Sequence, residues 1–255
     1  VQDELGKIVV GQSHVIDEVL MAVFSRGHAL LVGVPGLAKT LLVSTISRVL
    51  DLSFKRIQFT PDLMPSDITG TDVLDEDRGT GRRDFRFVQG PIFTNMLLAD
   101  EINRTPPKTQ AALLEAMQEH AVTVAGKSYQ LSEPFFVLAT QNPIEQEGTY
   151  PLPEAQVDRF MLKVVIGYPS IDEEKKIIRE NIAGEMPTVK PVTTAEDILT
   201  ARSVVREVYL DEKIEQYIAD IVFATRYPEK YGLKELKDMI GFGGSPRASI
   251  NLALA

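Results

Sequence analysis

Residues 33–40, GVPGLAKT, have the residue types and the spacing of a loop that binds phosphate groups. The common pattern is glycine, four variable residues, glycine, lysine and then serine or threonine. Gly33, Lys39 and Thr40 fit it, whereas Ala38 stands where the second glycine is usual. In such a loop backbone N–H groups converge on the phosphates and the lysine adds charge. The alternative is a plain glycine turn between a strand and a helix, with Lys39 in solvent.

Ala38 is compatible with such a loop if it lies in the first turn of the following helix. We expect a φ of about −60° there, which alanine accepts without strain. The positions that most need glycine have positive φ or a close backbone approach, and Gly33 and Gly36 remain for those. Pro35 removes one N–H donor but stiffens the loop.

Two adjacent carboxylates follow the apolar run at 96–99. Asp100 and Glu101 at the end of a buried strand would be costly unless they were paired or formed part of a site. Beside a phosphate loop, Asp100 can hold Mg²⁺ through water while Thr40 binds the ion directly. Glu101 can then orient and polarise an attacking water molecule. The alternative is an acidic strand end that faces solvent.

Five apolar runs predict the strands that would position these residues. They lie at 29–32, 54–59, 96–99, 135–143 and 159–167, and helical patterns lie between them. Strands that alternate with helices form parallel sheets, and ligands bind at the carboxyl ends of such strands. We therefore expect an α/β fold in which Asn142 lies beside Asp100, within reach of a γ-phosphate or the attacking water.

The composition sets the class of protein. The chain has 255 residues, enough for one large domain or two smaller ones. It carries 27 Lys and Arg against 36 Asp and Glu, a net charge of −9 that argues against a broad nucleic-acid surface. It has no cysteine, no apolar run near the roughly 20 residues of a membrane span and no signal-peptide pattern. We expect a cytoplasmic protein without membrane contacts, in which the isolated His14, His28 and His120 are structural or surface residues.

Together these motifs resemble those of the MoxR family of AAA+ ATPases, along essentially the whole chain. LLADEINR (97–104) is similar to the family's Walker B motif, and ATQNP (139–143) to the segment with the sensor-1 residue, here Asn142. LPEAQVDRF (152–160) resembles the segment that supplies the arginine finger, which assigns that role to Arg159. GGSPRA (243–248) resembles the sensor-2 motif, which assigns that role to Arg247.

The resemblance also covers the nucleotide contacts. VGQ (10–12) is similar to the family's adenine-contacting segment, and the phosphate loop to its Walker A motif, alanine included. It therefore implies nucleotide contacts by the following residues: Val10, Gly11, Gln12, Gly33, Val34, Pro35, Gly36, Leu37, Ala38, Lys39, Thr40, Leu41 and Asp100.

The family relationship would make the protein an ATPase that needs ATP and Mg²⁺. Lys39 would hold the β- and γ-phosphates, Thr40 and Asp100 would place Mg²⁺, and Glu101 would activate water. Hydrolysis would drive a ring of identical subunits, expected to be a hexamer, in chaperone-like remodelling, maturation or metal-cofactor insertion of a client protein. A partner with a von Willebrand factor A domain often accompanies such proteins. The alternatives are a phosphotransferase acting on a small acceptor and a module that binds ATP without hydrolysing it.

The two arginines can also be considered physically. Ser245-Pro246 suits the N-cap and first position of a helix. Arg247 would then lie in the first turn, where the helix dipole disfavours a cation unless an anion is bound. A salt bridge to a nearby carboxylate is the alternative. Arg159 is predicted at the start of a strand, where it could equally pair with Asp158 or Glu154.

The patterns of two sequence segments predict β-hairpins outside the sheet. VLDED and RRDFRFV flank a turn at Gly79-Thr80-Gly81, and AVTVAGKSYQLS (121–132) turns at Ala125-Gly126. A helix over 106–120, capped by Thr105, precedes the second hairpin, and Ser13 is predicted to cap an earlier helix that ends at Gly27. In the resembled family the corresponding segments are the helix-2 insert and the pre-sensor-1 hairpin, which project from the core and can contact client proteins. The alternative is that both pack on their own domain.

The chain is predicted to divide near Gly167-Tyr168-Pro169-Ser170. Residues 1–167 would form an AAA+ α/β nucleotide-binding domain with two inserted hairpins, and residues 168–255 a small all-helical lid. Val1 is not an initiator methionine, and the helical pattern at the end of the chain has no stop signal. We therefore expect the lid to be truncated at its C-terminus.

Overall fold

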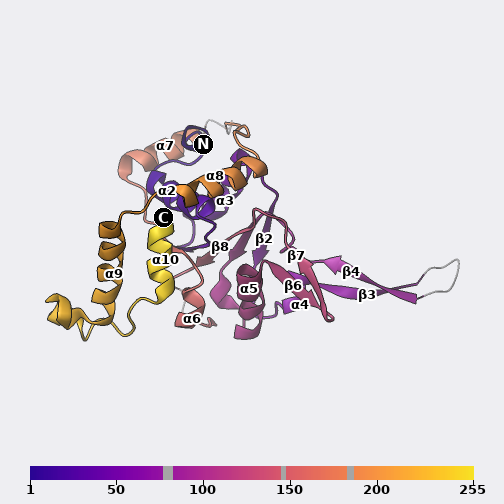
Figure 1. Ribbon diagram of the computed structural model, residues 1–255. Coiled ribbons are helices and arrows are strands. Elements are labelled where there is room, and N and C mark those ends of the chain that lie inside the picture. Colours follow the sequence, from indigo (N-terminus) through magenta and orange to yellow (C-terminus); the bar gives the residue numbers. More distant parts are fainter. Residues whose placement is uncertain (77–82, 145–147, 183–186) are drawn as a thin grey trace.

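A parallel sheet of five strands forms the centre of the protein (Figure 1). The computed structural model describes residues 1–76, 83–144, 148–182 and 187–255. In spatial order the strands are β2 (Phe54–Gln58), β5 (Met96–Asp100), β8 (Phe136–Gln141), β1 (Ala29–Val32) and β9 (Leu162–Val165). Every pairing between them is parallel. The predicted α/β fold with a five-stranded parallel sheet is thus confirmed.

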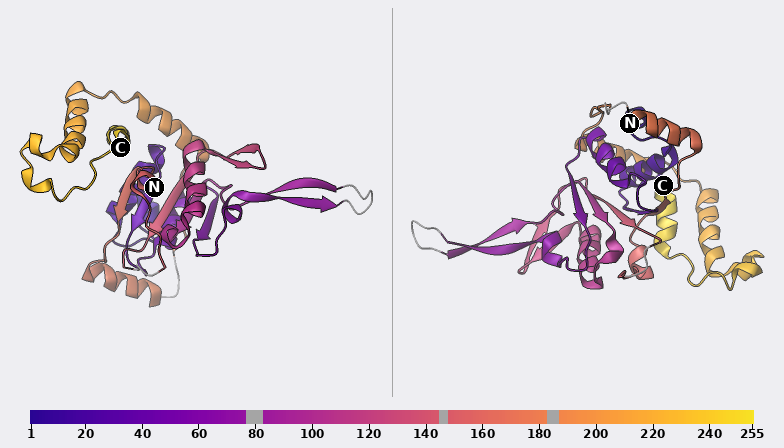
Figure 2. Two further views of the ribbon diagram at one scale, coloured as in Figure 1. Left: turned by 90° about the horizontal axis from the view of Figure 1, so that it is seen from below. Right: turned by 180° about the vertical axis from the view of Figure 1, so that it is seen from behind.

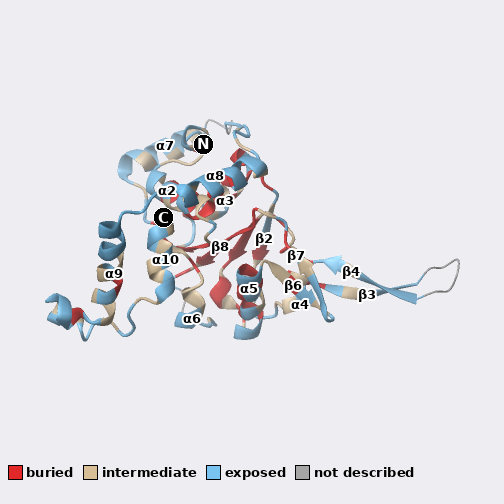
Figure 3. Cartoon of the chain, viewed as in Figure 1, coloured by how far each residue is buried: buried red, intermediate tan, exposed pale blue. Residues whose placement is uncertain are grey.

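Helices cover both faces of this sheet, because β5 and β8 are apolar and buried up to the polar residues at their carboxyl ends. Successive side chains of a strand point to opposite faces. On one face Leu31 and Leu138 pack with α2 (Ser13–Phe24) and α3 (Lys39–Val49). On the other face Leu30 and Val137 pack with α5 (Pro107–Glu119). The strands that end at the site are therefore fixed by two separate hydrophobic cores (Figure 3).

Two predicted helix caps are wrong. Gln12 is the N-cap of α2, and Ser13 is already helical. The N-cap of α5 is Pro106, because the hydroxyl of Thr105 points elsewhere and donates a hydrogen bond to the carbonyl of Thr60 (2.5 Å). Thr105 thus ties the start of α5 to the segment after β2, a tertiary contact that local sequence cannot reveal.

His28 is a buried structural residue just before β1. Its Nδ1 accepts a hydrogen bond from the backbone N–H of Val137 (3.0 Å), so the proton of the neutral ring lies on Nε2, 3.2 Å from the carbonyl of Met117. Burial lowers the pKa of the imidazole to about 4. His14, by contrast, is exposed and lies 3.0 Å from Glu18.

Two antiparallel hairpins extend from the sheet (Figure 2). The first pairs β3 (Gly70–Glu76) with β4 (Arg83–Gln89); its predicted turn at residues 79–81 lies outside the described residues. The second pairs β6 (Ala121–Val124) with β7 (Lys127–Gln130) and turns at Ala125-Gly126, as predicted, with φ values of 48° and 78°. The rings of Phe87 and Tyr129 stack with centroids 4.0 Å apart, so the two hairpins are in contact at their bases.

The chain after β9 is helical. It forms α7 (Ile171–Ile182), α8 (Ala195–Glu207), α9 (Glu212–Arg226) and α10 (Pro246–Leu254). α8 lies against α2: Ile198 is fully buried in the same cluster as the α2 side chains, and Arg202 Nε donates to the carbonyl of Val23 (2.9 Å). α9 and α10 contact each other and are largely exposed (Figure 3). The division of the chain near residues 167–170 stays a prediction.

Short elements complete the description. They are α1 (Gln2–Leu5), α4 (Pro65–Thr69), α6 (Glu154–Val157) and the 3-10 helices Ile102–Arg104, Pro228–Tyr231 and Lys234–Leu236. None of the helices within the described ranges is long and apolar enough to cross a membrane.

Candidate nucleotide-binding site

The loop between β1 and α3 lies at the carboxyl edge of the sheet. Gly36 has φ +87°, and a Cβ atom on Gly33 would lie 2.9 Å from the backbone oxygen of Ile166, so both positions need glycine as predicted. The prediction for Ala38 is wrong: it is the N-cap of α3 and adopts the left-handed conformation, with φ 52° and ψ 28°. The helix therefore starts one residue later, at Lys39, and the position that usually carries glycine does require positive φ.

Lys39 reaches back over the loop from the first turn of α3. Its Nζ donates to the carbonyl oxygens of Gly33 (2.5 Å) and Val34 (3.2 Å). Burial lowers the pKa of this ammonium group, and the charges of Asp100 and Glu101 oppose that shift. Lys39 is therefore held within electrostatic reach of both carboxylates.

A polar cavity of about 350 Å³ joins the loop to the ends of β5 and β8. Residues from all three elements line it: Pro35, Gly36, Leu37, Ala38, Lys39, Thr40, Asp100, Glu101 and Asn142. The predicted phosphate-binding, metal-binding and water-activating residues thus meet in one place. Asn142 is buried, and its Oδ1 accepts a hydrogen bond from the backbone N–H of Ile144 (3.1 Å).

Asp100 is 8% exposed and uses both oxygens. Oδ1 accepts from the hydroxyl of Thr140 (2.5 Å), and Oδ2 accepts from Nε (3.0 Å) and Nη2 (2.6 Å) of Arg56 on β2. The ion pair is the compensation that a buried carboxylate needs. Arg56 and Asp100 are 44 positions apart in sequence, and the pairing of β2 with β5 brings them together.

Glu101 leaves the strand in the left-handed conformation, with φ 56°. Its backbone N–H donates to Thr140 Oγ1 (2.8 Å). Its Oε2 accepts from Gln58 Nε2 (2.8 Å) and from Arg104 Nη1 (3.0 Å). The turn and these two donors aim the carboxylate at the cavity.

Sequence reasoning did not identify Arg56, Gln58, Arg104 or Thr140. For Arg56 and Gln58 the available signal was two polar residues two positions apart on a predicted strand, since such side chains share one face.

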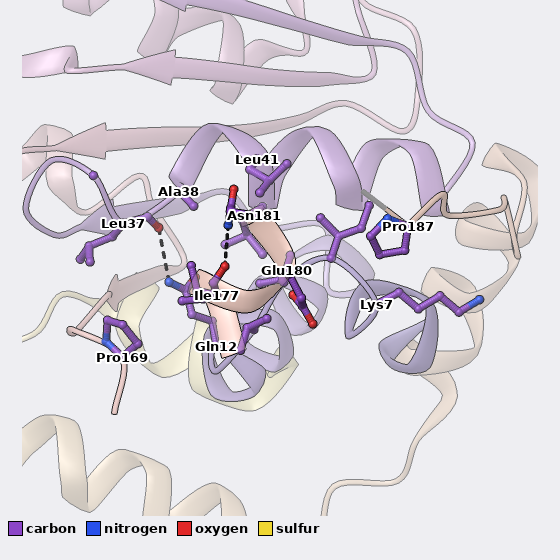
Figure 4. Close-up of a pocket in the computed structure, with 15 residues that line it drawn as sticks. Lys7, Gln12, Leu37, Ala38, Leu41, Pro169, Ile177, Glu180, Asn181 and Pro187 are labelled. Atoms are coloured by element: carbon purple, nitrogen blue, oxygen red, sulfur yellow. Dashed lines mark hydrogen bonds between the residues drawn. The ribbon is translucent and has the colours of Figure 1, made fainter. Parts of the chain in front are cut away.

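A second cavity, of about 240 Å³ and mostly apolar, adjoins the first and shares Gly36, Leu37 and Ala38 with it. Figure 4 shows it between the loop and α3 on one side and α7 on the other. Val10, Gln12 and Leu41 line it together with Ile177, Glu180 and Asn181 of α7. Such a lining suits a flat heterocyclic base.

Two side chains in this second cavity are already held by backbone carbonyls. Gln12 Nε2 donates to Leu37 O (3.3 Å), and Asn181 Nδ2 donates to Ile177 O (2.8 Å). Gly11 is not among the lining residues. Its φ is +74°, and a Cβ atom there would lie 2.4 Å from the carboxyl carbon of Glu173.

The two predicted arginines lie apart from this site. Arg159 follows α6 and precedes β9, and its Nη1 donates to the carbonyl of Leu114 (2.7 Å), not to Asp158 or Glu154. Arg247 lies in the first turn of α10, which Ser245 caps as predicted, and its Nη1 is 3.4 Å from Asp158 Oδ2. Both arginines line a separate cavity of about 110 Å³ beside His28.

The polar cavity has the chemistry that Mg²⁺ prefers. Thr40 offers a hydroxyl and Asp100 a carboxylate, and hard cations take oxygen ligands. Nowhere in the described residues do three or more His, Cys, Asp or Glu side chains cluster in a way that could hold a metal ion. An ion here would be coordinated by Thr40, phosphate oxygens and water, and Asp100 would hold it through one of those waters.

The chain was then compared with known proteins. Residues 28–162 match the sequence model of the family described as "ATPase family associated with various cellular activities (AAA)". "Chaperone MoxR1" of Mycobacterium tuberculosis is 46% identical over 252 residues, which are 99% of this chain and 66% of that protein. The chain belongs to the MoxR family of AAA+ ATPases. This confirms the family predicted from the motifs.

Two further proteins match nearly the whole chain. "Uncharacterized protein YeaC" of Bacillus subtilis is 44% identical over 254 residues, covering 99% of this chain and 75% of YeaC. A crystal structure from Cytophaga hutchinsonii, described as that of a candidate ATPase, superposes with a TM-score of 0.89 at 49% identity and covers 99% of this chain and 76% of its own. The chain thus spans 66% to 76% of the length of these relatives.

Proposed function

We propose that the protein binds ATP with Mg²⁺, hydrolyses it, and uses the hydrolysis to remodel a client protein within a ring of identical subunits. Membership of the MoxR family supports ATPase activity and a chaperone-like role. The observation that carries the proposal is the shared polar cavity of Lys39, Thr40, Asp100, Glu101 and Asn142, next to an apolar cavity suited to adenine.

Each residue has a role that follows from its position. Lys39 exchanges its two loop carbonyls for the β- and γ-phosphates, and backbone N–H groups at the start of α3 add further donors. Thr40 directly and Asp100 through water would hold Mg²⁺, which would neutralise charge on the phosphates. Glu101 orients and polarises the attacking water, and Asn142 hydrogen-bonds the γ-phosphate or that water.

Arg159 and Arg247 fit a site that neighbouring subunits complete. Arg159 lies in a cavity that shares no residue with the polar cavity of its own chain, so its contact with ATP would be made in the next subunit. A fixed cation there offsets charge on the transferring phosphoryl group. Arg247 would contact phosphate in place of Asp158. We expect the ring to be a hexamer and the client to be a protein, as the name of MoxR1 suggests for that relative.

The test is phosphate release by the wild-type chain and by Glu101→Gln, without any added acceptor. We expect Glu101→Gln to bind ATP normally and to lose turnover by about 10²-fold or more, because the amide cannot take the proton of the water. Glu115→Gln makes the same chemical change on the exposed face of α5 and serves as the matched control. Normal hydrolysis by Glu101→Gln would remove this residue from the base role.

The same assay separates the two other candidate functions. A phosphotransferase would release no phosphate in the absence of an acceptor, and with a small acceptor it would form ADP and the phosphorylated acceptor. A module that only binds ATP would release none at any protein concentration.

A further inference from the structure

Another cavity, of about 310 Å³, lies at the opposite edge of the sheet from the nucleotide site. None of the described residues that line it also lines the polar cavity or the apolar cavity beside that one. Its walls are the end of α2, Glu133, α8 and the end of α10, where Ser25 Oγ donates to the carbonyl of Leu254 (2.8 Å) (Figure 1). Ser25 and Glu133 lie shortly before β1 and β8, so this cavity is at the amino edge of the sheet, whereas the polar cavity is at the carboxyl edge.

Positive charge collects in this amino-edge cavity. Arg26, Arg202 and Arg206 line it, against one carboxylate among the described lining residues, that of Glu133. Arg26 Nη2 donates to Oε1 of Glu133 (2.9 Å), and Arg202 Nη1 donates to Oε2 (3.4 Å). Burial alone would raise the pKa of Glu133, but hydrogen bonds from the backbone N–H of Phe135 and from Arg26 hold it below its ordinary value. The carboxylate is therefore ionised, and three positive charges against one negative charge leave a surplus of two, in a chain whose net charge is −9.

Arg202 presents a buried donor to which no described residue offers an acceptor. Its side chain is 7% exposed. Its Nε donates to the carbonyl of Val23 (2.9 Å) and its Nη1 to Glu133, and these two bonds fix the plane of the guanidinium. Nη2 is buried as well, and it has no hydrogen-bond partner within the described ranges. A buried donor left unpaired is destabilising, so an acceptor bound in the cavity would stabilise this arginine.

Arg206 adds a second cation to the same wall of the cavity. It lies four positions after Arg202 on α8, so the two side chains are neighbours on one face of the helix. The Arg206 side chain is exposed, and it makes no ion pair with any residue that the structure describes. Like charges at this spacing repel each other, and an anion between them would reverse the penalty.

The lining also indicates which anion fits. A surplus of two positive charges matches a dianion, and three guanidinium groups can serve the three oxygens of a phosphate group, whereas a carboxylate offers two. The other lining residues are mainly apolar: Phe24, Leu199, Val205 and Leu254. The cavity volume of about 310 Å³ is at the lower end of the range for small-molecule sites. The ligand should therefore combine a phosphate group with a small apolar body.

We propose that the amino-edge cavity binds a small phosphate monoester, whose phosphate group lies between Arg202 and Arg206 with Arg26 as a third donor. The apolar part of the ligand packs against Phe24 and Leu199. The proposal is independent of the proposed function, since it uses no residue of the nucleotide site. A ligand here would contact α2, α8 and α10 at once and would stabilise the folded chain by mass action.

The experiment is a calorimetric titration of the nucleotide-free protein with phenyl phosphate, which carries close to two negative charges at about pH 7.5. We expect a Kd of about 1 mM or lower, and a rise in Tm of a few degrees at about ten times that concentration. Arg206→Gln should raise Kd at least about 10-fold, as the loss of hydrogen bonds between charged groups implies. Because Arg206 is exposed, this variant should keep the Tm of wild type when phenyl phosphate is absent.

Two variants serve as controls for this titration. Arg179→Gln is the matched one, because Arg179 is likewise exposed in the last turn of its helix, α7, and is not among the described residues that line any of the four cavities. It should bind phenyl phosphate with the Kd of wild type. Lys39→Met reports on the nucleotide site, and it too should leave this Kd unchanged.

Two other ligands test the chemistry. Benzoate has the same ring with one charge and two oxygens, and it should bind at least about 10-fold more weakly than phenyl phosphate. A blocked Gly-phosphotyrosine-Gly peptide carries the same phosphate group on a protein side chain, and it should bind no more tightly than phenyl phosphate. A Kd about 10-fold lower for the peptide would mean that the ligand is a modified side chain of a protein, and would overturn the assignment to a small molecule.

Three results would overturn the site itself or its selectivity. The first is a wild-type protein that does not bind phenyl phosphate. The second is a Kd that rises in Lys39→Met and not in Arg206→Gln, because phenyl phosphate would then bind in the nucleotide site. The third is benzoate that binds as tightly as phenyl phosphate. None of these measurements uses ATP hydrolysis, so each of these results would leave the proposed function intact.

Discussion

Ala38 offers a direct test of the loop geometry, because it is held in the left-handed conformation with φ 52°. That conformation costs a residue with a Cβ atom roughly 1–2 kcal/mol. Glycine avoids this cost but loses about 0.5–1 kcal/mol more conformational freedom on folding. Ala38→Gly should therefore raise the free energy of unfolding by about 0.5–1 kcal/mol, which for a chain of this size raises Tm by roughly 1–4 °C.

The measurement is urea and thermal unfolding of Ala38→Gly beside Ala111→Gly. Ala111 lies on the exposed face of α5, where the same substitution should lower the free energy of unfolding by about 1 kcal/mol. The two variants thus make one chemical change and should shift stability in opposite directions. If Ala38→Gly were destabilising by as much as Ala111→Gly, residue 38 would be helical and the described loop geometry would be refuted.

Three further outcomes are expected. The pKa of folded His28 is lowered to about 4 from an ordinary 6.5, so between those pH values only the unfolded chain binds the extra proton. The free energy of unfolding should therefore fall by up to about 3 kcal/mol on acidification from pH 6.5 to 4. An unchanged stability across that range would contradict the burial of His28. Lys39→Met should weaken ATP binding at least about 10-fold, as the loss of a charged hydrogen bond implies, and equal affinity would mean that the loop is only structural. Arg159→Ala should bind ATP but not hydrolyse it. Rings that mix Arg159→Ala with Glu101→Gln subunits should regain activity, once subunit exchange has been confirmed. If such mixed rings stay inactive, Arg159 is a local packing residue.

Local patterns in the sequence were enough to predict the elements and the residues at their ends. The apolar run before Gly33 and the helical spacing after Lys39 identify strand, loop and helix without reference to the rest of the chain. The run before Asp100 does the same for β5. Because carboxyl ends of parallel strands share one edge, these separate motifs could also be expected to meet.

The partners of those residues could not be predicted in the same way. Arg56 reaches Asp100 only because β2 is the neighbour of β5 at the edge of the sheet, and nothing local in the sequence fixes that order. Arg159 donates to the carbonyl of Leu114 because α5 packs beside the turn after α6. The conformation of Ala38 could not be predicted either. The loop places Ala38 at a positive φ just before Lys39, and the intrinsic preference of alanine does not indicate such a conformation.

The exposed hairpin of β3 and β4 offers a practical way to detect a bound protein. Its seven cross-strand pairs run from Gly70–Gln89 to Glu76–Arg83, and its opposed Leu74 and Phe85 are 51% and 73% exposed. A two-stranded ribbon is marginally stable by itself in water, so its amide protons should exchange with deuterium through local opening, well before those of β5. A protein that covered Leu74 and Phe85 would slow this exchange. Peptides from the hairpin would then gain less mass from deuterium than they do in the free protein. The ribbon would therefore report the binding of any protein that covers it, and mass spectrometry would read this without a label or a mutation.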